Sequence, residues 1–364
     1  MQNQNTPEEL RATESAWRTA AAACNGSLAG SAVLFLPCDG AWVESGIEVA
    51  PGQAISLLAS GQVWLSREAN LSFGPNVALW YRIGDGPIAR CPANTGSFVA
   101  DRAGALRLIT KPPGEWADVA GNFLPEYPHQ GASGGLLVAV LAWRGSAEAG
   151  LQAFAAHDRS GIGEAERVRY AARKPLPVGW QPLWRIGLTD MFREEVESDG
   201  RGAIVCRCNN DVAILKYPVD VPLSEAIRMT WSWRIDRLPA AVAENTTATH
   251  DYLSVAVEFE NGQDLSYLWS SSLPVGTAFR CPLSWWDKHE THVVLRSGAR
   301  GLGRWMSEEQ SVLLDYQKIV GGELPERIIG VWLIAVSAFQ RQSGLAAYRD
   351  LQLLASDGVV RIGP

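Results

Sequence analysis

The sequence predicts an all-β protein with two β-sandwich, jelly-roll-like domains, a short N-terminal helix and a partly helical connector. Short apolar runs alternate with turn residues along most of the chain, which is typical of antiparallel sandwiches. The 35 Gly and 20 Pro supply the turns, and the 15 Trp supply broad aromatic surfaces. A length of 364 residues favours two cores, because single cores stop growing at about 250–300 residues.

Composition and charge exclude several classes of protein. A formal net charge of −7 argues against a general nucleic-acid binder, which needs clustered cations facing phosphates. No apolar run approaches the roughly 20 residues that cross a bilayer, so we expect no membrane contact. The start, MQNQNTPEELRATESAWR, lacks a basic segment followed by an apolar one, so we expect a cytoplasmic protein. The six cysteines show no zinc-type C-x2-C pairing, and we expect free buried thiols.

Residues 1–30 are expected to hold one helix, over about 7–24. Thr6 is the candidate N-cap, Pro7 suits the first turn, and Glu8 and Glu9 suit the positive end of the helix dipole. Apolar residues including Trp17 form a stripe before Asn25 and Gly26 stop the helix. We expect a helix that docks on the rest of the protein and has no functional role of its own.

Residues 31–146 are expected to form the first sandwich. The runs AVLFLP, AISLLASGQVWL, ALWYRIG, GALRLIT and GGLLVAVLAW are separated by turns such as FGPN and GDGP. Residues 147–185 are polar and helix-permissive, which favours a connector. Residues 186–364 are expected to form the second sandwich, with strands such as IRMTWSWRID, DYLSVAVEFE and GVWLIAV.

The stretch from Gly46 to Phe123 resembles the PA-I-type galactose-binding bacterial lectins. The carrying motifs are GIEVAPGQAISLLASGQVWL, FGPN, IGDGP, NTGSFVA and GALRLITKPPGEW. In that family an acidic residue and amides after the last of these strands bind calcium, which holds the sugar hydroxyls. Here Lys111 begins that segment, and Asp118 and Asn122 are the oxygen donors left nearby. The resemblance therefore implies the fold, and it does not carry over the calcium.

The stretch from about 180 to 353 resembles the bacterial family named domain of unknown function 3047. Its carrying motifs are TWSWRIDRLP, HDYLSVAVEFE, LSYLWSSSLPVGT, LDYQK and AAYRDLQLL. That family usually has an acidic pair where His250 and Asp251 stand, and acidic residues where this chain has 336–338. The resemblance implies a jelly roll akin to concanavalin-like glucanases.

Strand periodicity provides candidate site residues in the second sandwich. Side chains two apart share a face, and jelly rolls often curve one face into a groove. A His beside a carboxylate in such a groove can move protons, so the catalytic candidates are His250, Asp251 and Glu258. Because neighbours on a strand point opposite ways, a capping Asp and a surface His remain the alternative. The substrate-binding candidates are Tyr252, Arg234, Trp231, Trp233, Tyr267, Trp269 and Trp286.

Two of these candidates have structural alternatives. Arg234 could clamp an anionic group, or it could pair with Asp236 or Glu258. The cluster that runs from Trp285 to His292 offers a ligand loop, or a loop that packs its own tryptophans. It lacks HExxH or HxH-plus-carboxylate spacing, so the sequence predicts no metal site and no cofactor.

The sequence favours an acid/base enzyme, a hydrolase, lyase or hydratase. Its substrate would be a glycosidic or compact apolar small molecule, bound in a Trp-lined pocket of the second sandwich or between the domains. The first alternative is a non-catalytic, lectin-like protein that binds carbohydrate. The second is an assembly protein with tryptophan interfaces. The sequence does not decide whether the protein forms a homo-oligomer. Expected partners are a small molecule or saccharide, without nucleic acid or membrane.

Overall fold

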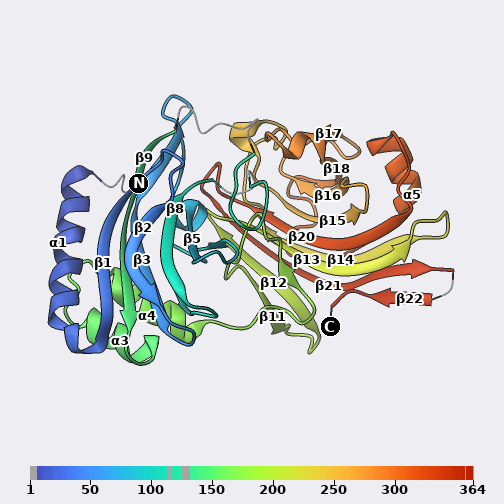
Figure 1. The fold of residues 1–364 in the computed structure, drawn as a ribbon. Helices are drawn as coiled ribbons and strands as arrows, with labels where there is room; N and C mark the ends of the chain where they lie inside the picture. Colours follow the sequence, from blue (N-terminus) through green and yellow to red (C-terminus); the bar gives the residue numbers. More distant parts are fainter. Residues whose placement is uncertain (1–5, 113–115, 125–131, 357, 364) are drawn as a thin grey trace. The chain divides into compact units, whose positions relative to one another are not determined.

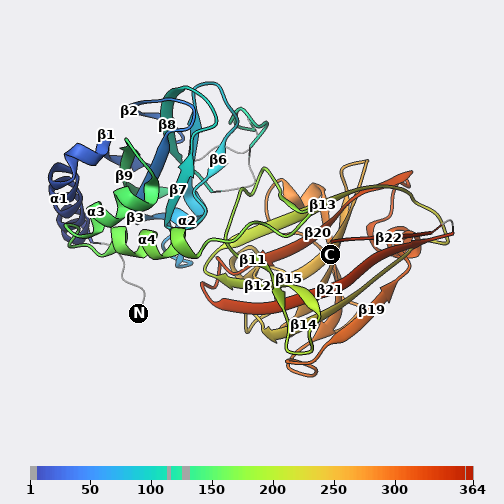
Figure 2. The ribbon, with the colours of Figure 1, turned by 90° about the horizontal axis from the view of Figure 1, so that it is seen from below.

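The computed structural model describes residues 6–112, 116–124, 132–356 and 358–363, and it divides the chain into two compact units, 1–173 and 174–364. Both units are built mainly of strands (Figures 1 and 2), which confirms the predicted all-β class. The elements of the first unit are α1 (Pro7–Ala23), η1 (Asn25–Ser27), β1 (Leu28–Pro37), β2 (Val43–Val49), β3 (Ala54–Ser66), β4 (Leu71–Phe73), α2 (Pro75–Ala78), β5 (Leu79–Ile83), β6 (Ala89–Arg90), β7 (Thr95–Val99), β8 (Gly104–Thr110), β9 (Ser133–Trp143), α3 (Ala147–Ala155) and α4 (Ile162–Ala172).

Helix α1 begins where the sequence predicts. Thr6 accepts the backbone N–H of Glu9, and the Glu9 carboxylate accepts the backbone N–H of Thr6, which completes a capping box. The buried face of the helix carries Trp17, Ala20 and Ala21. The indole N–H of Trp17 donates to the hydroxyl oxygen of Ser160 at 3.0 Å, so the helix also contacts the segment before α4. These contacts confirm the expected docking helix.

The strands of the first unit form two sheets. One has the order β1-β9-β3-β4, with β7 also paired to β3, and the other has the order β2-β8-β5-β6. Alternate residues of β9, such as Leu141 and Trp143, share an apolar cluster with helices α1 and α3. Leu151 and Phe154 of α3 are completely buried there. Hence the helical half of the expected 147–185 connector packs into the first unit.

The second unit contains two larger sheets. Their orders are β10-β13-β20-β15-β16-β18-β17 and β11-β12-β21-β14-β19, with β22 paired to β21. Neighbours are antiparallel except β16 and β18, which are parallel. The elements are β10 (Gln181–Pro182), β11 (Phe192–Val196), β12 (Gly202–Asn209), β13 (Val212–Pro222), β14 (Arg228–Arg237), η2 (Thr247–Thr249), β15 (Leu253–Phe259), β16 (Asp264–Ser270), β17 (Ala278–Arg280), η3 (Trp286–Lys288), β18 (Glu290–Ser297), β19 (Met306–Gln310), α5 (Val312–Asp315), η4 (Tyr316–Val320), β20 (Arg327–Val336), β21 (Ser343–Ala355) and β22 (Gly358–Arg361).

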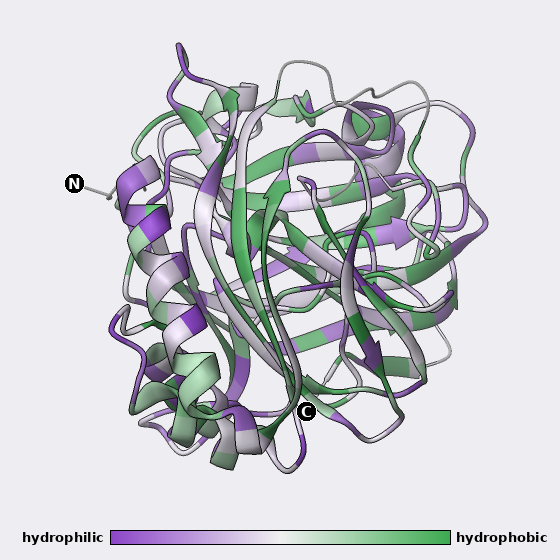
Figure 3. Ribbon diagram, turned by 60° about the vertical axis from the view of Figure 1, so that its left-hand side comes forward, coloured by the Kyte–Doolittle hydropathy of each residue, from purple (hydrophilic) through white to green (hydrophobic). Residues whose placement is uncertain are grey.

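The seven-stranded sheet is buried on both faces. Its inner face, with residues such as Val255 and Leu333, forms the sandwich core with the six-stranded sheet. Its outer face carries Tyr252 and Trp332 among others, and it is covered by segments that include Cys281 and Trp286. Strands buried on both faces are nearly continuous apolar runs, and β15 and β16 are buried along almost their whole length. Figure 3 colours the chain by hydropathy and shows long apolar stretches within strands. Several polar residues of this outer face, among them His250, Glu290 and His292, are therefore shut away from water, while the Glu258 side chain stays 17% exposed.

The described part of the chain has no helix that is long and apolar enough to cross a bilayer.

Replacing Trp231 with alanine is expected to lower the free energy of unfolding of the second unit by about 3–5 kcal/mol. The ring is 1% exposed, and its loss leaves a cavity in the sandwich core. Phenylalanine at the same position should cost less than about 2 kcal/mol, because it keeps most of the packing. Chemical denaturation followed by circular dichroism measures both, with the exposed Val275→Ala as control. A loss below about 1 kcal/mol for Trp231→Ala would contradict the packed-core placement.

Candidate metal centre

Four aromatic candidates lie in the core of the sandwich. Trp231, Trp233, Tyr267 and Trp269 are each no more than 1% exposed and belong to one inter-sheet cluster. Neighbouring rings contact each other, with centroids 5.4 Å apart for Trp231 and Tyr267 and 5.7 Å apart for Trp233 and Trp269. We therefore correct the prediction that these rings bind substrate. They do share one face of their strands, but that face is the inner one.

Asp251 and Glu258 each have structural partners of their own. Asp251 accepts the backbone N–H groups of Phe339 at 3.0 Å and of Gln340 at 2.6 Å. Burial raises the pKa of Asp251 to about 6, although these two N–H groups oppose the rise. Glu258 pairs with the Lys216 ammonium at 2.6 Å and accepts the indole N–H of Trp332 at 2.9 Å. The structure does not bring these two carboxylates together with His250 as one acid/base set.

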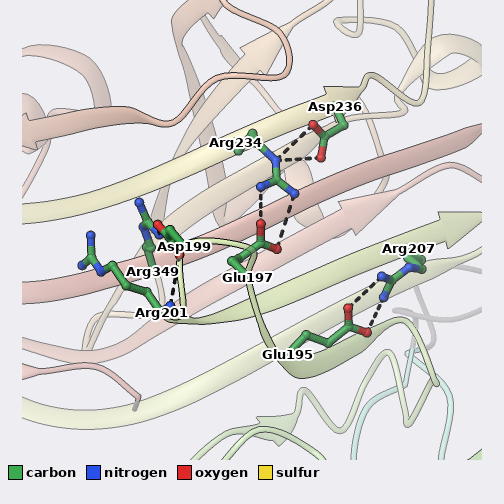
Figure 4. A network of polar contacts seen from close by, with 8 residues as sticks. All are labelled: Glu195, Glu197, Asp199, Arg201, Arg207, Arg234, Asp236 and Arg349. Atoms are coloured by element: carbon green, nitrogen blue, oxygen red, sulfur yellow. Dashed lines mark hydrogen bonds and ion pairs between the residues drawn. The ribbon is translucent and has the colours of Figure 1, made fainter.

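Arg234 lies on the outer face of the six-stranded sheet, in a network of ion pairs (Figure 4). Its guanidinium pairs with Asp236 at 2.9 Å and with Glu197. Nearby, Arg349 pairs with Asp199 at 2.6 Å and lies over the ring of Trp305. Of the partners that the sequence offered to Arg234, Asp236 is confirmed and Glu258 is not. The guanidinium is thus held by two carboxylates of its own sheet.

His250 lies at the start of a polar cluster on the outer face of the seven-stranded sheet. It follows η2 directly and is 1% exposed. Its Nδ1 lies 2.7 Å from the carbonyl oxygen of Glu244, which can only accept, so Nδ1 carries the proton. The lone pair of Nε2 then points at the Sγ of Cys281, 3.3 Å away.

Glu290 and His292 reach the same place from β18, where residues two apart share a face. Glu290 Oε1 accepts the hydroxyl of Tyr252 at 3.0 Å, and its Oε2 lies 3.6 Å from His292 Nε2. Phe279 of the neighbouring strand β17 stacks on the His292 ring. Within the described residues, neither ring nitrogen of His292 has a hydrogen-bond partner. A buried imidazole in this situation is costly unless another ligand completes it.

The four side chains of His250, Cys281, Glu290 and His292 converge. Each offers one ligand atom, and these atoms lie within 4.8 Å of one another. Tetrahedral coordination with bonds of about 2.0–2.3 Å separates its ligand atoms by about 3.3–3.8 Å. Two of the separations fall in that range, 3.3 Å from His250 Nε2 to Cys281 Sγ and 3.6 Å from His292 Nε2 to Glu290 Oε2, and all pairs lie within 4.8 Å. All four residues are at most 2% exposed, so the arrangement is closed to solvent.

Burial holds these ligands in their neutral forms. It raises the pKa of Glu290 to about 7 and lowers the pKa of His250 to about 4. It also raises the pKa of the Cys281 thiol and lowers that of His292. A divalent cation would favour the ionised forms of Glu290 and Cys281 instead, because it stabilises a carboxylate and a thiolate.

Sequence reasoning did not find Cys281, Glu290 and His292 as ligands. They come with His250 from three segments, the loop before β15, the loop after β17 and strand β18. No local spacing motif joins such segments, and only the alternation of Glu290 and His292 on one strand was visible. Of the other two predicted binding residues, Tyr252 donates to Glu290, and Trp286 lies 6% exposed in the covering cluster.

The first unit has an ammonium close to where the lectin resemblance places calcium. Lys111 is completely buried, and its Nζ lies 4.7 Å from the ring centroid of Phe123 and 5.3 Å from that of Trp116. Asp118 is used within its own loop, where it accepts the Asn122 side-chain amide at 2.7 Å. Asp118 also accepts the backbone N–H groups of Ala120 and Asn122, so its own loop already occupies its oxygens.

Known proteins that are similar to this chain match each of its two units. Residues 189–352 match the sequence profile of the family described as "Protein of unknown function (DUF3047)". The first unit is similar to the N-terminal domain of EclA, a PllA-like lectin, at 18% identity over 32% of this chain and 98% of that domain, with a TM-score of 0.25. No curated protein matches the chain.

Other similar structures are carbohydrate-active sandwiches. The xyloglucanase domain of NopAA from Sinorhizobium fredii, in complex with cellobiose, is 10% identical over 45% of this chain and 86% of that one, with a TM-score of 0.29. A family 11 carbohydrate-binding module from Clostridium thermocellum is 9% identical over 49% of this chain and 84% of that one, with a TM-score of 0.25. Likenesses this distant carry no argument about function.

Calcium is expected to leave the thermal unfolding of the full chain unchanged. The Asp118 carboxylate already accepts the Asn122 side-chain amide and two backbone N–H groups of its own loop, so a calcium ion would have to displace these bonds and would gain little. Differential scanning calorimetry with and without about 5 mM CaCl2 measures the effect. A rise in the Tm of the first unit by more than about 2 °C would contradict the expectation, because it would report about 0.5–1 kcal/mol of binding energy.

Proposed function

We propose that the second unit binds one divalent transition-metal ion, of which Zn²⁺ fits best. The ligands are His250 Nε2, the Cys281 thiolate, the Glu290 carboxylate and a ring nitrogen of His292. The observation that carries the proposal is the approach of these four ligand atoms to within 4.8 Å of one another.

The ligand chemistry supports zinc. Imidazole nitrogen, thiolate and carboxylate oxygen are the donors that Zn²⁺ takes in proteins, in tetrahedral arrangements. One thiolate and one carboxylate neutralise the two positive charges of the ion, which is favourable where no ligand is more than 2% exposed. Four protein ligands leave no coordination position for a substrate, which is typical of a structural centre.

Contacts beyond the ligands support the same role. The Glu244 carbonyl orients His250 from the preceding loop, and Tyr252 orients Glu290. Metal ligands are commonly fixed by such outer hydrogen bonds. The Glu244 carboxylate in turn accepts the hydroxyl of Ser270 at the end of β16. The ion would therefore join the covering segments to the outer face of the sheet.

The acid/base enzyme expected from the sequence has less support than this metal centre. It requires His250 and Glu258 to act on one substrate, whereas His250 faces Cys281 and Glu258 is paired with Lys216.

The purified full chain is expected to contain about one zinc ion per molecule and to bind Co²⁺ with tetrahedral visible bands and a thiolate charge-transfer band. Cys281→Ser and His292→Ala should lower the metal content to below about a fifth of wild type. His289→Gln is the matched control, because His289 lies on the same segment and contacts the Gly262 carbonyl. Elemental analysis and absorption spectroscopy measure these outcomes.

Removal of the ion should also destabilise the second unit. An ion present at about 1,000 times its Kd contributes about 4 kcal/mol, which corresponds to a Tm lower by about 8–16 °C after chelation. A wild-type chain that takes up neither zinc nor cobalt after supplementation would refute the metal centre.

We infer as a second candidate that the first unit binds a small polar ligand such as a saccharide. A pocket of about 660 Å³ lies there, and Gln53, Arg144, Ser146 and Tyr170 line it with hydrogen-bonding and aromatic groups. Such side chains hold sugars through hydroxyl contacts and ring stacking. The motifs between Gly46 and Phe123 add the likeness to galactose-binding lectins.

A glycan array probed with the labelled full chain is expected to show saccharide binding. Tyr170→Ala and Arg144→Ala should each weaken that binding by about tenfold or more, because each removes a wall of the pocket. Phe35→Ala is the control, since Phe35 is a 54% exposed aromatic residue outside the pocket lining. Equal loss in all three variants, or no binding at all, would contradict this candidate.

A further inference from the structure

Three carboxylates stand in one row across the outer face of the seven-stranded sheet. In the strand register Glu258 of β15 is opposite Asp264 of β16, and Asp264 is opposite Glu290 of β18. Neighbouring strands lie about 4.8 Å apart, so each carboxylate is next to the following one. The row leads to Glu290, which belongs to the metal centre proposed above.

The row runs from a partly exposed residue to buried ones. The side chain of Glu258 is 17% exposed and that of Glu290 is 3% exposed, while Asp264 as a residue is 2% exposed. At the exposed end the Lys216 ammonium holds Glu258 Oε2 at 2.6 Å, which is where an arriving cation would bind. Gly330 faces Glu258 from β20, and a Cβ there would collide with Glu258 Oε2. This glycine leaves room for the carboxylate.

Asp264 differs in its hydrogen bonding from a buried carboxylate that fixes the structure of a loop. Asp251, which fixes a loop, accepts two backbone N–H groups. The Oδ1 of Asp264 accepts no hydrogen bond from any described residue, although the residue is as deeply buried. Leaving a buried acceptor unpaired costs about 1–3 kcal/mol. A cation that passes this atom would give it a transient partner.

The closed geometry of the centre requires a route for the ion. Its four ligand residues are at most 2% exposed, so an ion cannot reach them directly from water. A divalent cation that loses hydration needs oxygen ligands along its way. We propose that Asp264 passes the incoming metal ion from Glu258 to Glu290, with the Lys216 ammonium leaving Glu258 as the ion arrives. This route rests on the proposed metal binding.

Rates of metal uptake test the route. The full-length chain is freed of metal with a chelator and mixed with Co²⁺ in a stopped-flow spectrometer, where the thiolate band of Cys281 reports binding. Asp264→Asn is expected to slow association by about tenfold or more and to slow dissociation equally, so that Kd stays within about threefold of wild type. A merely structural role would not separate the rates from the affinity in this way.

Two further variants give opposite expectations. Glu258→Gln should slow association by about threefold, and Lys216→Gln should speed it, because the resident ammonium no longer competes for Glu258. Ser266→Ala is the matched control, since Ser266 is buried on the same strand face and pairs with Ser254. Thermal unfolding of each variant shows whether it folds. If Asp264→Asn does not fold, the association rates of Glu258→Gln and Lys216→Gln decide the test.

Three results would overturn the route. Unchanged association in Asp264→Asn, or in Glu258→Gln and Lys216→Gln together, would show that ions enter elsewhere. A Kd weakened as much as the association rate would assign Asp264 to the bound state. Absence of the cobalt band in the wild-type chain would refute the metal centre itself, and this outcome is distinct from the other two.

Discussion

The second unit depends on a sheet that is buried on both faces. The inner face of the seven-stranded sheet forms the sandwich core, and the outer face is covered by the segments around His250 and Cys281. Every polar side chain that is fully buried on that outer face must find a partner without water. Ser254 and Ser266 pair with each other, and Tyr252 donates to Glu290. Groups that have such partners are therefore structural, and groups that lack them are the candidates for binding a ligand.

The proposed metal ion would supply partners for the buried groups on this face that hydrogen bonds leave unpaired. His292 has two buried nitrogens without partners among the described residues, and Cys281 and Glu290 are two buried acids beside it. Each group alone is unfavourable in a low-dielectric site. Around one divalent ion the same groups become ligands and their charges balance. The outer face and its covering segments then form one unit with the sandwich.

Local patterns predicted the fold well. The capped helix from Pro7, the turn-rich first sandwich and the face shared by Trp231 and Trp233 were all readable, because these features depend on neighbours in sequence. Alternation could not say whether that face was a core or a groove, since it divides the side chains of β14 between two faces without showing what covers either face. The metal ligands escaped prediction because they meet only through tertiary pairing, with β17 beside β18 and the loop before β15 folded over them.

The buried ammonium of Lys111 has a consequence for the protein as a whole. A cation that belongs to the chain cannot be diluted, exchanged or chelated, so its contacts with the Trp116 and Phe123 rings persist where free metals are scarce. The second unit would follow the metal supply of its surroundings through a dissociable ion. One polypeptide would thus combine a half that is indifferent to metal starvation with a half that senses it.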